Sequence, residues 1–589
     1  MIKRTHTCGE VRESHIGETI SLNGWISKSR DLGGLRFIDL RDRYGKTQIV
    51  FNEGLNKDAL AKVKRLGLED VIGITGVVVA RPDEAKNTNI PTGGIDVEVT
   101  ELEVYNESDP SPFDINDRNS ASEDHRLKYR YLELRTQALQ GNMVMRHKAA
   151  IATRNFMNDA GFIEIETPVL MKSTPEGARD FLVPSRIHKG RFYALPQSPQ
   201  TYKQLLMVSG MDKYFQIVKC FRDEDFRADR QPEFTQIDIE MSFVEQDDVV
   251  ELGTNLTRHL WKSSLDVDLP ESFPVITYYD AMEKYGSDKP DTRFGIELNE
   301  FSSYVERSDF KAFKSVLESE GRVKAVVCPN GESYSRKVID ELTEKMKTYY
   351  SAKGLAWMKC KDGFLDGGIS KFFSQDVQKD IIADLSVNDG DIIFIIGDKP
   401  KVVFNALGAL RIELARRENL IDKNIWAPLW VVDFPLVEWN EDLERWDALH
   451  HPFTSPHPED LDKMDSDPSN IRSLGYDIVM NGYELGGGSI RIHDKDLQAR
   501  IFTLLGISDG DAKEKFGFLM NAFKYGAPPH GGMAFGFDRL IMLLVGSKQI
   551  RDVIAFPKTT SAMSLMDQSP SNVDKKQLDE LGLSLKKKK

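Results

Sequence analysis

The sequence predicts an α+β protein of several domains: a small N-terminal β-barrel of the OB type, a larger mixed core, and a domain inserted into that core. Its 589 residues exceed what one hydrophobic core usually serves, so we expect about three or four domains. Strand patterns fill the first 108 residues. Further on, two stretches contain clusters of glycine, arginine and carboxylates. Between them lies a Lys- and Glu-rich stretch without such clusters.

The barrel prediction rests on five short segments that are rich in β-branched residues and bounded by glycine turns. They span residues 19–26, 35–40, 47–51, 71–80 and 95–104. Between residues 28 and 46, six Lys or Arg and three Asp surround Phe37. This segment is either a solvated barrel face or a groove for single-stranded nucleic acid, in which an aromatic ring stacks on bases.

The remaining domain boundaries follow from linker and cap signals. Residues 109–140 open with Asp-Pro-Ser-Pro and are interpreted as a hinge. A helix is predicted from 143 to 160, ended by Gly161, and a strand from 162 to 170 that Pro168 interrupts. We assign the core to 141–292 and 422–557, and an inserted α/β domain to 293–421. Residues 558–589 end in four lysines and are expected to form a flexible or loosely docked tail.

Composition limits the class of protein without fixing it. The net charge of −14 argues against a general nucleic-acid coat protein, but RNA can be recognised through local basic patches. The sequence has no run of 18 apolar residues and therefore predicts no membrane span. Its four cysteines lie far apart and form no CxxC pair, which fits a reduced, cytoplasmic setting better than a zinc site or a disulfide framework.

Two clusters carry residues suited to nucleotide chemistry. In residues 221–234, Arg222 and Glu224 alternate along a strand and share a face, where the cation can bind a phosphate and the carboxylate an amine or a metal; Phe234 could stack on a base. In residues 532–539, glycines precede Arg539 at the start of an apolar helix, where a phosphate can bind. Taken singly, the first is usually a surface ion pair and the second an ordinary turn. The sequence contains no Walker loop.

Together with Gly161 to Pro168, these clusters resemble the three signature motifs of class II aminoacyl-tRNA synthetases, of which the first forms the dimer interface in that family. Ala534 stands where many class II enzymes carry glycine, as it does in the aspartyl branch. Residues 173–181, 197–203, 236–240, 450–454 and 482–491 resemble the aspartate-site segments of bacterial aspartyl-tRNA synthetases. Residues 293–421 resemble their inserted, GAD-like domain, so the likeness covers nearly the whole chain.

The resemblance implies an antiparallel class II catalytic sheet. It also implies a cytoplasmic homodimer, without membrane contact, that uses ATP and Mg²⁺ to convert L-aspartate into aspartyl-adenylate and loads it onto the 3′ end of tRNA(Asp). The implied catalytic residues are Arg222, Glu224 and Arg539; those for aspartate are Glu176, Gln200, Lys203, Arg222, Asp238, His450 and Arg491; those for ATP are Arg222, Asp223, Glu224, Gln231, Phe234, Glu484, Gly536, Phe537, Asp538 and Arg539; those for Mg²⁺ are Asp477 and Glu484; and those for the anticodon are Arg30, Phe37, Gln48, Arg81 and Asp96.

Three rival interpretations stay open. An asparaginyl- or lysyl-type synthetase shares the barrel and the core, although Arg491 with Lys203 favours a dicarboxylate substrate. An amide ligase that uses no tRNA would not need the barrel, and a pure RNA-binding module would not need the ATP motifs. Leu32 is the residue type of enzymes that charge tRNA(Asp) alone, where those that also charge tRNA(Asn) often carry histidine, so strict specificity is expected.

Overall fold

The computed structural model describes residues 1–174, 179–224 and 230–586. The chain forms two compact units. The first comprises Met1–Arg146 and Gln549–Asn572, and the second comprises His147–Lys548 and Val573–Lys589. Gln549–Asn572, which holds the end of the predicted core and the start of the predicted tail, therefore belongs to the same unit as the barrel and the predicted hinge, although some 400 residues of sequence lie between.

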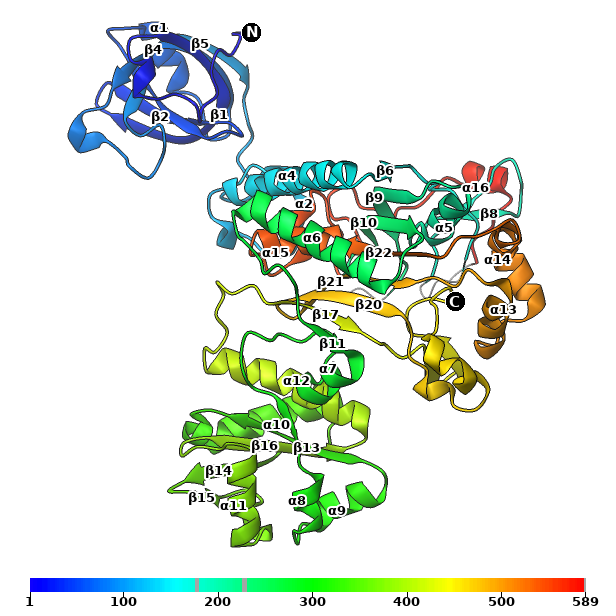
Figure 1. Cartoon of the computed structure of the whole chain (residues 1–589). Coiled ribbons are helices and arrows are strands. Elements are labelled where there is room, and N and C mark those ends of the chain that lie inside the picture. The colour runs from blue at the N-terminus through cyan, green and yellow to red at the C-terminus, as the bar shows by residue number, and fades with distance from the viewer. Residues whose placement is uncertain (175–178, 225–229, 587–589) are drawn as a thin grey trace. The chain divides into compact units, whose positions relative to one another are not determined.

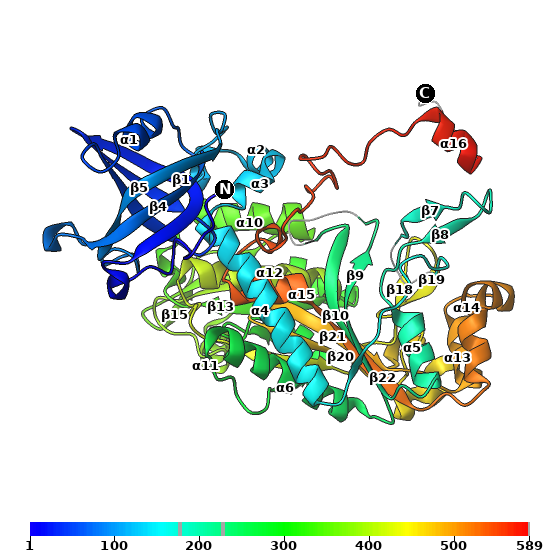
Figure 2. The same cartoon turned by 90° about the horizontal axis from the view of Figure 1, so that it is seen from above.

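In the first unit, five strands close a barrel in the order β1-β2-β3-β5-β4, which confirms the predicted OB-type domain (Figure 2). Alternate residues such as Ile20 and Leu22 are buried in the barrel core, and the residues between them point outward. The elements are β1 (Thr19–Leu32), β2 (Leu35–Arg41), β3 (Lys46–Asn52), α1 (Lys57–Val63), β4 (Val71–Ala80) and β5 (Ile95–Asn106).

Two short helices, α2 (Glu123–Lys128) and α3 (Arg130–Glu133), hold the segment Gln549–Asn572 within the first unit. Arg130 is 2% exposed, pairs with Glu133 at 2.5 Å, and donates to the backbone carbonyls of Arg551 and Ile554. The next helix, α4 (Gln137–Asp159), begins earlier than predicted because the Thr136 hydroxyl caps it by accepting from the Leu139 amide.

The second unit is built on an eight-stranded sheet with the order β11-β17-β20-β21-β22-β10-β9-β6. Neighbouring strands are antiparallel except for the two outermost pairs. Strands from before and after the insertion interleave, so both predicted core stretches form one sheet. The strands are β6 (Ile163–Glu164), β9 (Lys213–Phe221), β10 (Glu233–Ser242), β11 (Val275–Thr277), β17 (Pro428–Val432), β20 (Gly475–Met480), β21 (Tyr483–Ile490) and β22 (His530–Gly536).

Helices α6 (Gln246–Leu265) and α15 (Phe537–Leu544) pack against one face of this sheet (Figure 1). Gly253 lets α6 come close, since a Cβ there would lie 2.8 Å from the Trp430 ring. Buried Ile237 and Ile239 alternate along β10 with carboxylates, which consequently point to the opposite face. That opposite face is the one on which the site is built.

The predicted strand at 162–170 is wrong over most of its length. Only Ile163–Glu164 form β6, followed by a single further backbone bond from Ile165 to Phe215. Beyond it, Thr167 bonds through its side chain to Gln216. Pro168 has no amide hydrogen with which to continue the ladder.

The inserted domain has its own five-stranded sheet, in the order β12-β13-β16-β14-β15. Strand β16 is buried on both faces, with Ile392 and Phe394 against α10 and α12, and Ile393 and Ile395 against α8, α9 and α11. Its elements are β12 (Leu298–Glu300), α8 (Ser302–Glu306), α9 (Lys311–Glu318), β13 (Arg322–Cys328), α10 (Arg336–Tyr350), β14 (Ala356–Lys361), β15 (Phe364–Asp366), α11 (Gln375–Asp384), β16 (Ile392–Asp398) and α12 (Pro400–Arg417).

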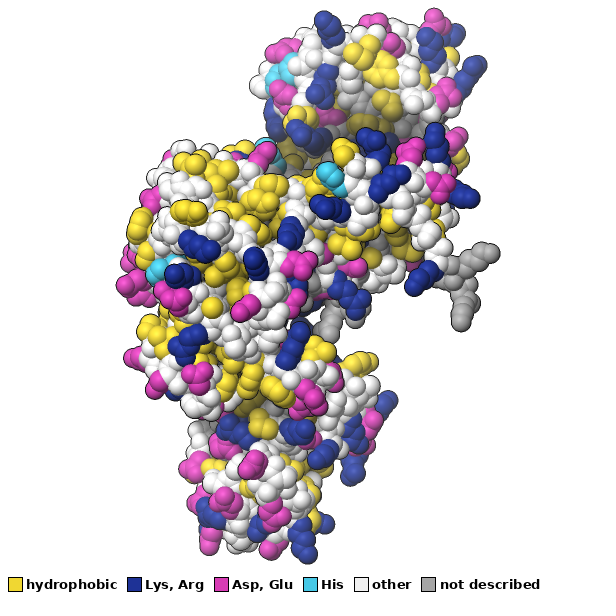
Figure 3. Space-filling model, turned by 90° about the vertical axis from the view of Figure 1, so that its right-hand side faces the viewer, with side chains coloured by type: hydrophobic (Ala, Val, Ile, Leu, Met, Phe, Trp, Pro, Cys, Tyr) yellow, Lys and Arg dark blue, Asp and Glu magenta, His cyan; other side chains and the backbone are white. Residues whose placement is uncertain are grey.

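Smaller elements complete the second unit: β7 (Leu182–Pro184), β8 (Phe192–Ala194), α5 (Gln200–Val208), α7 (Tyr278–Tyr285), β18 (Val437–Asn440), β19 (Arg445–Ala448), α13 (Lys495–Leu504) and α14 (Asp509–Phe523). The tail contains a helix, α16 (Lys575–Leu581). Within the described ranges, no helix combines the length and apolar character needed to cross a membrane. Charged side chains of both signs are interspersed over the face in Figure 3.

Candidate active site

The sheet face opposite α6 carries one row of paired residues that joins two of the predicted carboxylates. Asp238 on β10 pairs with Ala534 on β22, Ala534 with Gly487 on β21, and Gly487 with Asp477 on β20. Residues that are paired directly point to the same face, so Asp238 and Asp477 stand at the two ends of the row. Because Ala534 and Gly487 between them have small or no side chains, they leave space for a ligand above the sheet.

The floor belongs to a run of three glycines in β21. A Cβ at Gly487 would lie 1.9 Å from Oδ1 of Asp477. At Gly486 and Gly488 it would lie 2.4 and 2.0 Å from backbone oxygens of β22. A strand with glycine at such positions is typical of a place where a ligand or another backbone comes close.

Four charged side chains form a buried, neutral cluster beside this row. Lys203 on α5 donates to Oδ1 of Asp238 at 2.7 Å and lies 3.2 Å from Oε2 of Glu240. Arg491 grips Glu240 with two bonds, from Nε to Oε1 at 2.9 Å and from Nη2 to Oε2 at 3.1 Å. All four side chains are at most 2% exposed. Two cations therefore balance two carboxylates, as burial requires.

The two carboxylates of the cluster respond differently to burial. Burial disfavours the ionised form of Glu240, but Arg491 and Lys203 outweigh it and hold the pKa at about 2. Burial raises the pKa of Asp238, and Lys203 offsets this only in part. Oδ2 of Asp238 has no hydrogen-bond partner among the described residues. Both carboxylate oxygens of Glu240 are thus hydrogen-bonded to Arg491, whereas one oxygen of Asp238 is available to accept a hydrogen bond from a ligand.

Two adjacent histidines occupy different environments. His450, the predicted aspartate contact, lies with Nε2 3.5 Å from Oδ1 of Asp477 and packs edge-on against Phe434. His451 accepts from Nη1 of Arg491 at 2.5 Å. Burial, together with the nearby Arg491 charge, holds the pKa of His451 well below its usual value, so this ring is neutral.

The prediction that Arg222 and Glu224 alternate along one strand is wrong, because β9 ends at Phe221. Arg222 follows directly on β9, and its backbone amide donates to the Pro232 carbonyl. Its guanidinium lies 5.1 Å from the centre of the Phe234 ring, a cation–π contact. Nε of Arg222 is buried and makes no hydrogen bond within the described chain. Glu224 pairs with Arg230 at 2.8 Å, and Asp223 is exposed. Arg222 therefore keeps a donor available for an anion.

The turn from β22 into α15 brings the second cluster against β21. Arg539 donates from Nη1 to the Glu484 carbonyl at 2.7 Å, and its guanidinium lies 3.8 Å from the Glu484 carboxylate. Asp538 is 2% exposed and accepts from the Thr235 amide at 2.7 Å, which ties α15 to β10. Gly536 is the N-cap residue, and the Phe537 side chain is buried. The Asp538 carboxylate thus supports the site from within the sheet.

Other predicted site residues lie around this centre. Gln200 is buried in the first turn of α5 and donates to Gln204 at 3.2 Å. Gln231 is 5% exposed and lies just before β10. Glu176, predicted to hold the ammonium group of aspartate, lies outside the described residues.

On the barrel, the five residues predicted to bind the anticodon gather on the outward face. Arg30 pairs directly across the strands with Phe37 and donates to Gln48 at 2.6 Å. Gln48 donates to Asp96 at 2.8 Å, and Arg81 binds the same Asp96 oxygen at 2.8 Å. Burial raises the pKa of Asp96, which Arg81 partly offsets. A half-buried aromatic ring next to a chain of donors and acceptors is suited to unpaired bases.

Two residues of the centre had no predicted role. Glu240 was recognisable, because Asp238 and Glu240 alternate in one strand and share its face. His451 was not, because nothing in the local sequence distinguishes it from His450.

Comparisons with known proteins agree with this geometry. The family described as tRNA synthetases class II (D, K and N) matches residues 122–560, and the OB-fold nucleic acid binding domain matches 20–108. Aspartate–tRNA ligase from Staphylococcus saprophyticus is 52% identical over 588 residues and covers 100% of both chains. Aspartate–tRNA(Asp/Asn) ligase from Caldanaerobacter subterraneus is 52% identical over 99% of this chain and 98% of its own.

A solved structure of asparaginyl-tRNA synthetase from Pyrococcus horikoshii, complexed with asparaginyl-adenylate, shares the fold with a TM-score of 0.59. It covers 95% of this chain and 99% of its own, at 19% identity. The full-length match to curated relatives separates the amino-acid branches, which the fold does not. The chain belongs to the class II tRNA synthetases of the D, K and N group and, within that group, to the bacterial-type aspartyl-tRNA synthetases.

Proposed function

We propose that the chain activates L-aspartate with ATP and transfers it to tRNA(Asp), using the buried cluster of Lys203, Asp238, Glu240 and Arg491 to select the amino acid. This cluster carries the proposal, because it concentrates two cations in an enclosed site and leaves one Asp238 oxygen without a partner among the described residues. Nε and Nη2 of Arg491 bind Glu240, and Nη1 donates to His451 and to the Ser489 hydroxyl, so the substrate carboxylate would replace these two neutral acceptors at Nη1, next to Lys203.

Charge then distinguishes aspartate from asparagine, which has nearly the same size. The neutral amide would place its NH₂ group against donors and leave the cationic edge without an acceptor. A site built for polar pairing can reject such an analogue by about 10⁴-fold or more. Gln200, the free oxygen of Asp238 and Glu176 are assigned to the α-ammonium group, and His450 stands beside the substrate.

In the activation step, the α-carboxylate of aspartate attacks the α-phosphorus of ATP, and pyrophosphate leaves. The free Nε of Arg222 orients the α-phosphate against the attacking oxygen, and Arg539 compensates the charge of the leaving phosphates. Phe234 stacks on adenine, while Glu224 and Gln231 line the nucleotide. The 3′-hydroxyl of the terminal tRNA adenosine then attacks the activated carbonyl, and AMP leaves. Positioning and electrostatics supply the acceleration.

Asp477 and Glu484 fit the requirements for Mg²⁺. Burial raises the pKa of Asp477, and the nearby charge of Glu484 raises it further, an effect that a divalent cation would reverse. Magnesium in nucleotide sites typically takes one or two protein carboxylates and completes its shell with phosphates and water. When bound, it would neutralise charge on the ATP phosphates.

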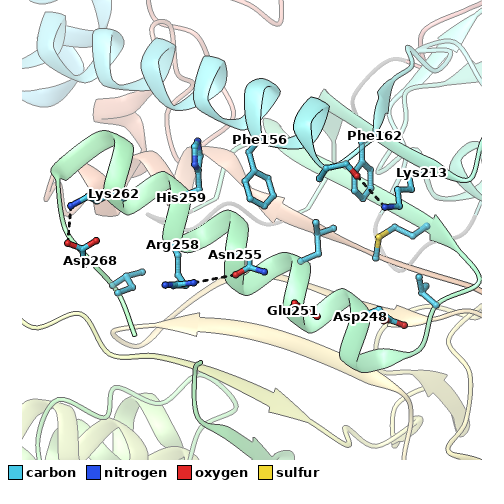
Figure 4. Close-up of a pocket in the computed structure, with 15 residues that line it drawn as sticks. Phe156, Phe162, Lys213, Asp248, Glu251, Asn255, Arg258, His259, Lys262 and Asp268 are labelled. Atoms are coloured by element: carbon cyan, nitrogen blue, oxygen red, sulfur yellow. Dashed lines mark hydrogen bonds and ion pairs between the residues drawn. The ribbon is translucent and has the colours of Figure 1, made fainter. Parts of the chain in front are cut away.

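A homodimer is proposed from the segment that resembles the first motif. Ile151 on α4, Ile163, Val169 and Leu170 are 44–51% exposed. Close by, Phe156 and Phe162 point into a groove between α4 and α6 (Figure 4). Exposed apolar patches of this kind mark interaction surfaces, and sedimentation should give the mass of two chains. The cytoplasmic location we propose agrees with four buried cysteines that form no disulfide among the described residues.

The decisive assay is ATP–pyrophosphate exchange without tRNA, with aspartate, asparagine and lysine compared. Wild-type exchange that prefers asparagine or lysine would overturn the choice of substrate. Arg222→Ala should lower the aspartate-dependent rate by roughly 10²–10³-fold, the usual effect of losing one charge-stabilising donor. A near-normal rate in this variant would remove Arg222 from the mechanism.

Strict charging of tRNA(Asp) is proposed from Leu32, which is 65% exposed beside the Gly33–Gly34 turn of the anticodon face. Relatives with both kinds of name are 52% identical to this chain, so overall identity does not decide the question. Purified tRNA(Asp) and tRNA(Asn) should be charged in parallel by the wild type and Leu32→His. Equal charging of both tRNAs by the wild type contradicts the proposal.

A further inference from the structure

A second, strongly basic cavity lies where the inserted domain meets the catalytic sheet. It has a volume of about 1130 Å³. The insertion contributes the end of α10, one side of α12 and both linkers, and the core contributes the β20–β21 turn and Lys548 after α15. It is distinct from the aspartate cluster, but its lining residue Tyr483 directly precedes Glu484 of the ATP site.

The lining holds seven Lys or Arg against a single carboxylate, Asp291, although the whole chain carries a net charge of −14. Three of these cations are engaged: Arg293 with Asp291, Lys401 with Glu438, and Arg411 with backbone carbonyls. The other four are exposed and form no ion pair within the described ranges: Lys289, Arg416, Lys423 and Lys548. Such an excess of unpaired cations creates a positive electrostatic potential, which attracts polyanions.

The frame of the cavity is rigid. Helix α7 meets α12 at two glycines, since a Cβ at Gly286 would lie 2.3 Å from the Phe404 carbonyl, and one at Gly408 would lie 2.5 Å from that of Gly286. Arg411 is 1% exposed and lies between the rings of Tyr285 and Phe294, at 4.9 and 4.4 Å from their centres. The exposed cations therefore project from a closely packed base. Little of this base needs to become ordered when a ligand binds, which lowers the entropic cost of binding.

We propose that this cavity binds backbone phosphates of the tRNA substrate, and thereby gives the inserted domain a role in holding RNA. The four unpaired cations come from the two linkers, the end of α12 and the core, an arrangement that suits successive phosphates better than a single anion. Tyr349, 75% exposed at the end of α10, offers a ring to a base or ribose. The proposal rests on the proposed tRNA charging and adds a contact remote from the anticodon.

The test compares two double variants of the full-length chain. Lys423→Gln with Lys548→Gln removes one unpaired cation from each side of the cavity. Lys337→Gln with Lys361→Gln removes two exposed lysines of the inserted domain that lie outside it. For each, the affinity for tRNA(Asp) is measured by fluorescence anisotropy at several salt concentrations. Tripolyphosphate binding and tRNA-free exchange are measured in parallel.

The cavity variant should bind tRNA roughly tenfold more weakly at low salt, and its slope of log affinity against log salt should fall by about one for each lysine removed. The control variant should match the wild type in both respects, and exchange with aspartate should be unchanged in all. Equal tRNA affinity and slope in both variants overturn the proposal. Loss of tripolyphosphate binding with normal tRNA binding would also overturn it, in favour of a small anion. Failure of the proposed function would show separately, as absent wild-type exchange.

Discussion

The Arg491–Glu240 pair of the proposed aspartate cluster and the Arg30–Asp39 pair of the proposed anticodon face both join arginine to a carboxylate, but they differ in their access to water. The Arg81–Asp96 pair of the barrel is buried, like Arg491–Glu240. The side chains of Arg491 and Glu240 are 2% and 0% exposed, whereas those of Arg30 and Asp39 are 45% and 18% exposed. Removing one partner of a buried pair costs about 3–5 kcal/mol, because the other charge is left without compensation. An exposed pair is worth about 0–1 kcal/mol.

This difference in solvent exposure determines whether a substitution affects folding as well as ligand binding. In the cluster, folding and substrate choice depend on the same charges, so one substitution should damage both. At the exposed Arg30–Asp39 pair, water can replace a lost partner, so a substitution there should affect RNA binding and leave the fold intact. Variants of the two regions can test this distinction directly.

Arg491→Leu should have the largest effect. It leaves the buried Glu240 carboxylate without its cationic partner and removes the guanidinium group proposed to bind the substrate carboxylate. We expect aspartate-dependent exchange to fall by about 3–5 kcal/mol, which is roughly a hundred- to several-thousandfold. The preference for aspartate over asparagine should shrink, whereas ATP binding should change little. A variant that keeps the wild-type preference would show that Arg491 does not select the substrate.

The matched control for this variant is Arg491→Leu combined with Glu240→Leu. Replacing both partners by apolar groups removes the stranded charge, so the thermal unfolding midpoint should recover while aspartate activation stays low. If the single and double variants unfold at the same temperature, the Glu240–Arg491 pair does not couple folding to specificity.

Acid should distinguish the two regions next. Because the pKa of folded Glu240 is about 2, below its usual 4.5, the unfolded chain binds the proton first. The stability from ionised Glu240 is complete above the usual pKa and is lost as the pH falls towards 2. Burial raises the pKa of Asp96 on the barrel, so protonation there favours the folded form. Between pH 6 and pH 3.5, the wild-type unfolding midpoint should fall more steeply than that of the Arg491→Leu, Glu240→Leu variant, and parallel curves would contradict the assignment.

Phe37→Ala should have the smallest effect, and on RNA alone. Loss of one stacked base costs about 1–3 kcal/mol of tRNA affinity, so charging at limiting tRNA should weaken. Exchange without tRNA should be unchanged, and Phe37→Tyr should retain most of the affinity. An equal loss in the two assays would mean that Phe37 acts as a packing residue.

Local sequence predicted those features that one strand or helix determines alone. The strand predicted at 71–80 matches β4, whereas Asp238 on β10 was assigned from the family resemblance alone. The row from Asp238 to Asp477 required pairing of β10 with β22, whose paired residues Asp238 and Ala534 lie about 300 residues apart, and only the family resemblance placed both carboxylates in one site. The grip of Arg491 on Glu240 was missed because pairing across three strands has no local signature.

Errors in the predicted elements came from their ends. The strand predicted at 162–170 stops at Glu164. Beyond it, Thr167 bonds to Gln216 through its side chain, and Pro168 has no amide hydrogen for a backbone bond to the neighbouring strand. In the tail, expected to be flexible or loosely docked, the structure adds a short helix that was not predicted, α16, which ends at Gly582 in the left-handed conformation that glycine favours. Propensity identified these segments, but tertiary contacts set their limits.

The glycine run of β21 has a consequence for inhibitors. A compound lying on Gly486 to Gly488 would touch main-chain atoms, which a point mutation cannot alter chemically. Escape by substitution would require a side chain whose first carbon falls 1.9 to 2.4 Å from Asp477 or the neighbouring strand, and this would distort the sheet that forms the floor of the site. A compound anchored on Arg491 or Lys203 would instead depend on side chains that evolution can exchange. The main-chain floor is therefore the part of this site where drug resistance should be hardest to acquire.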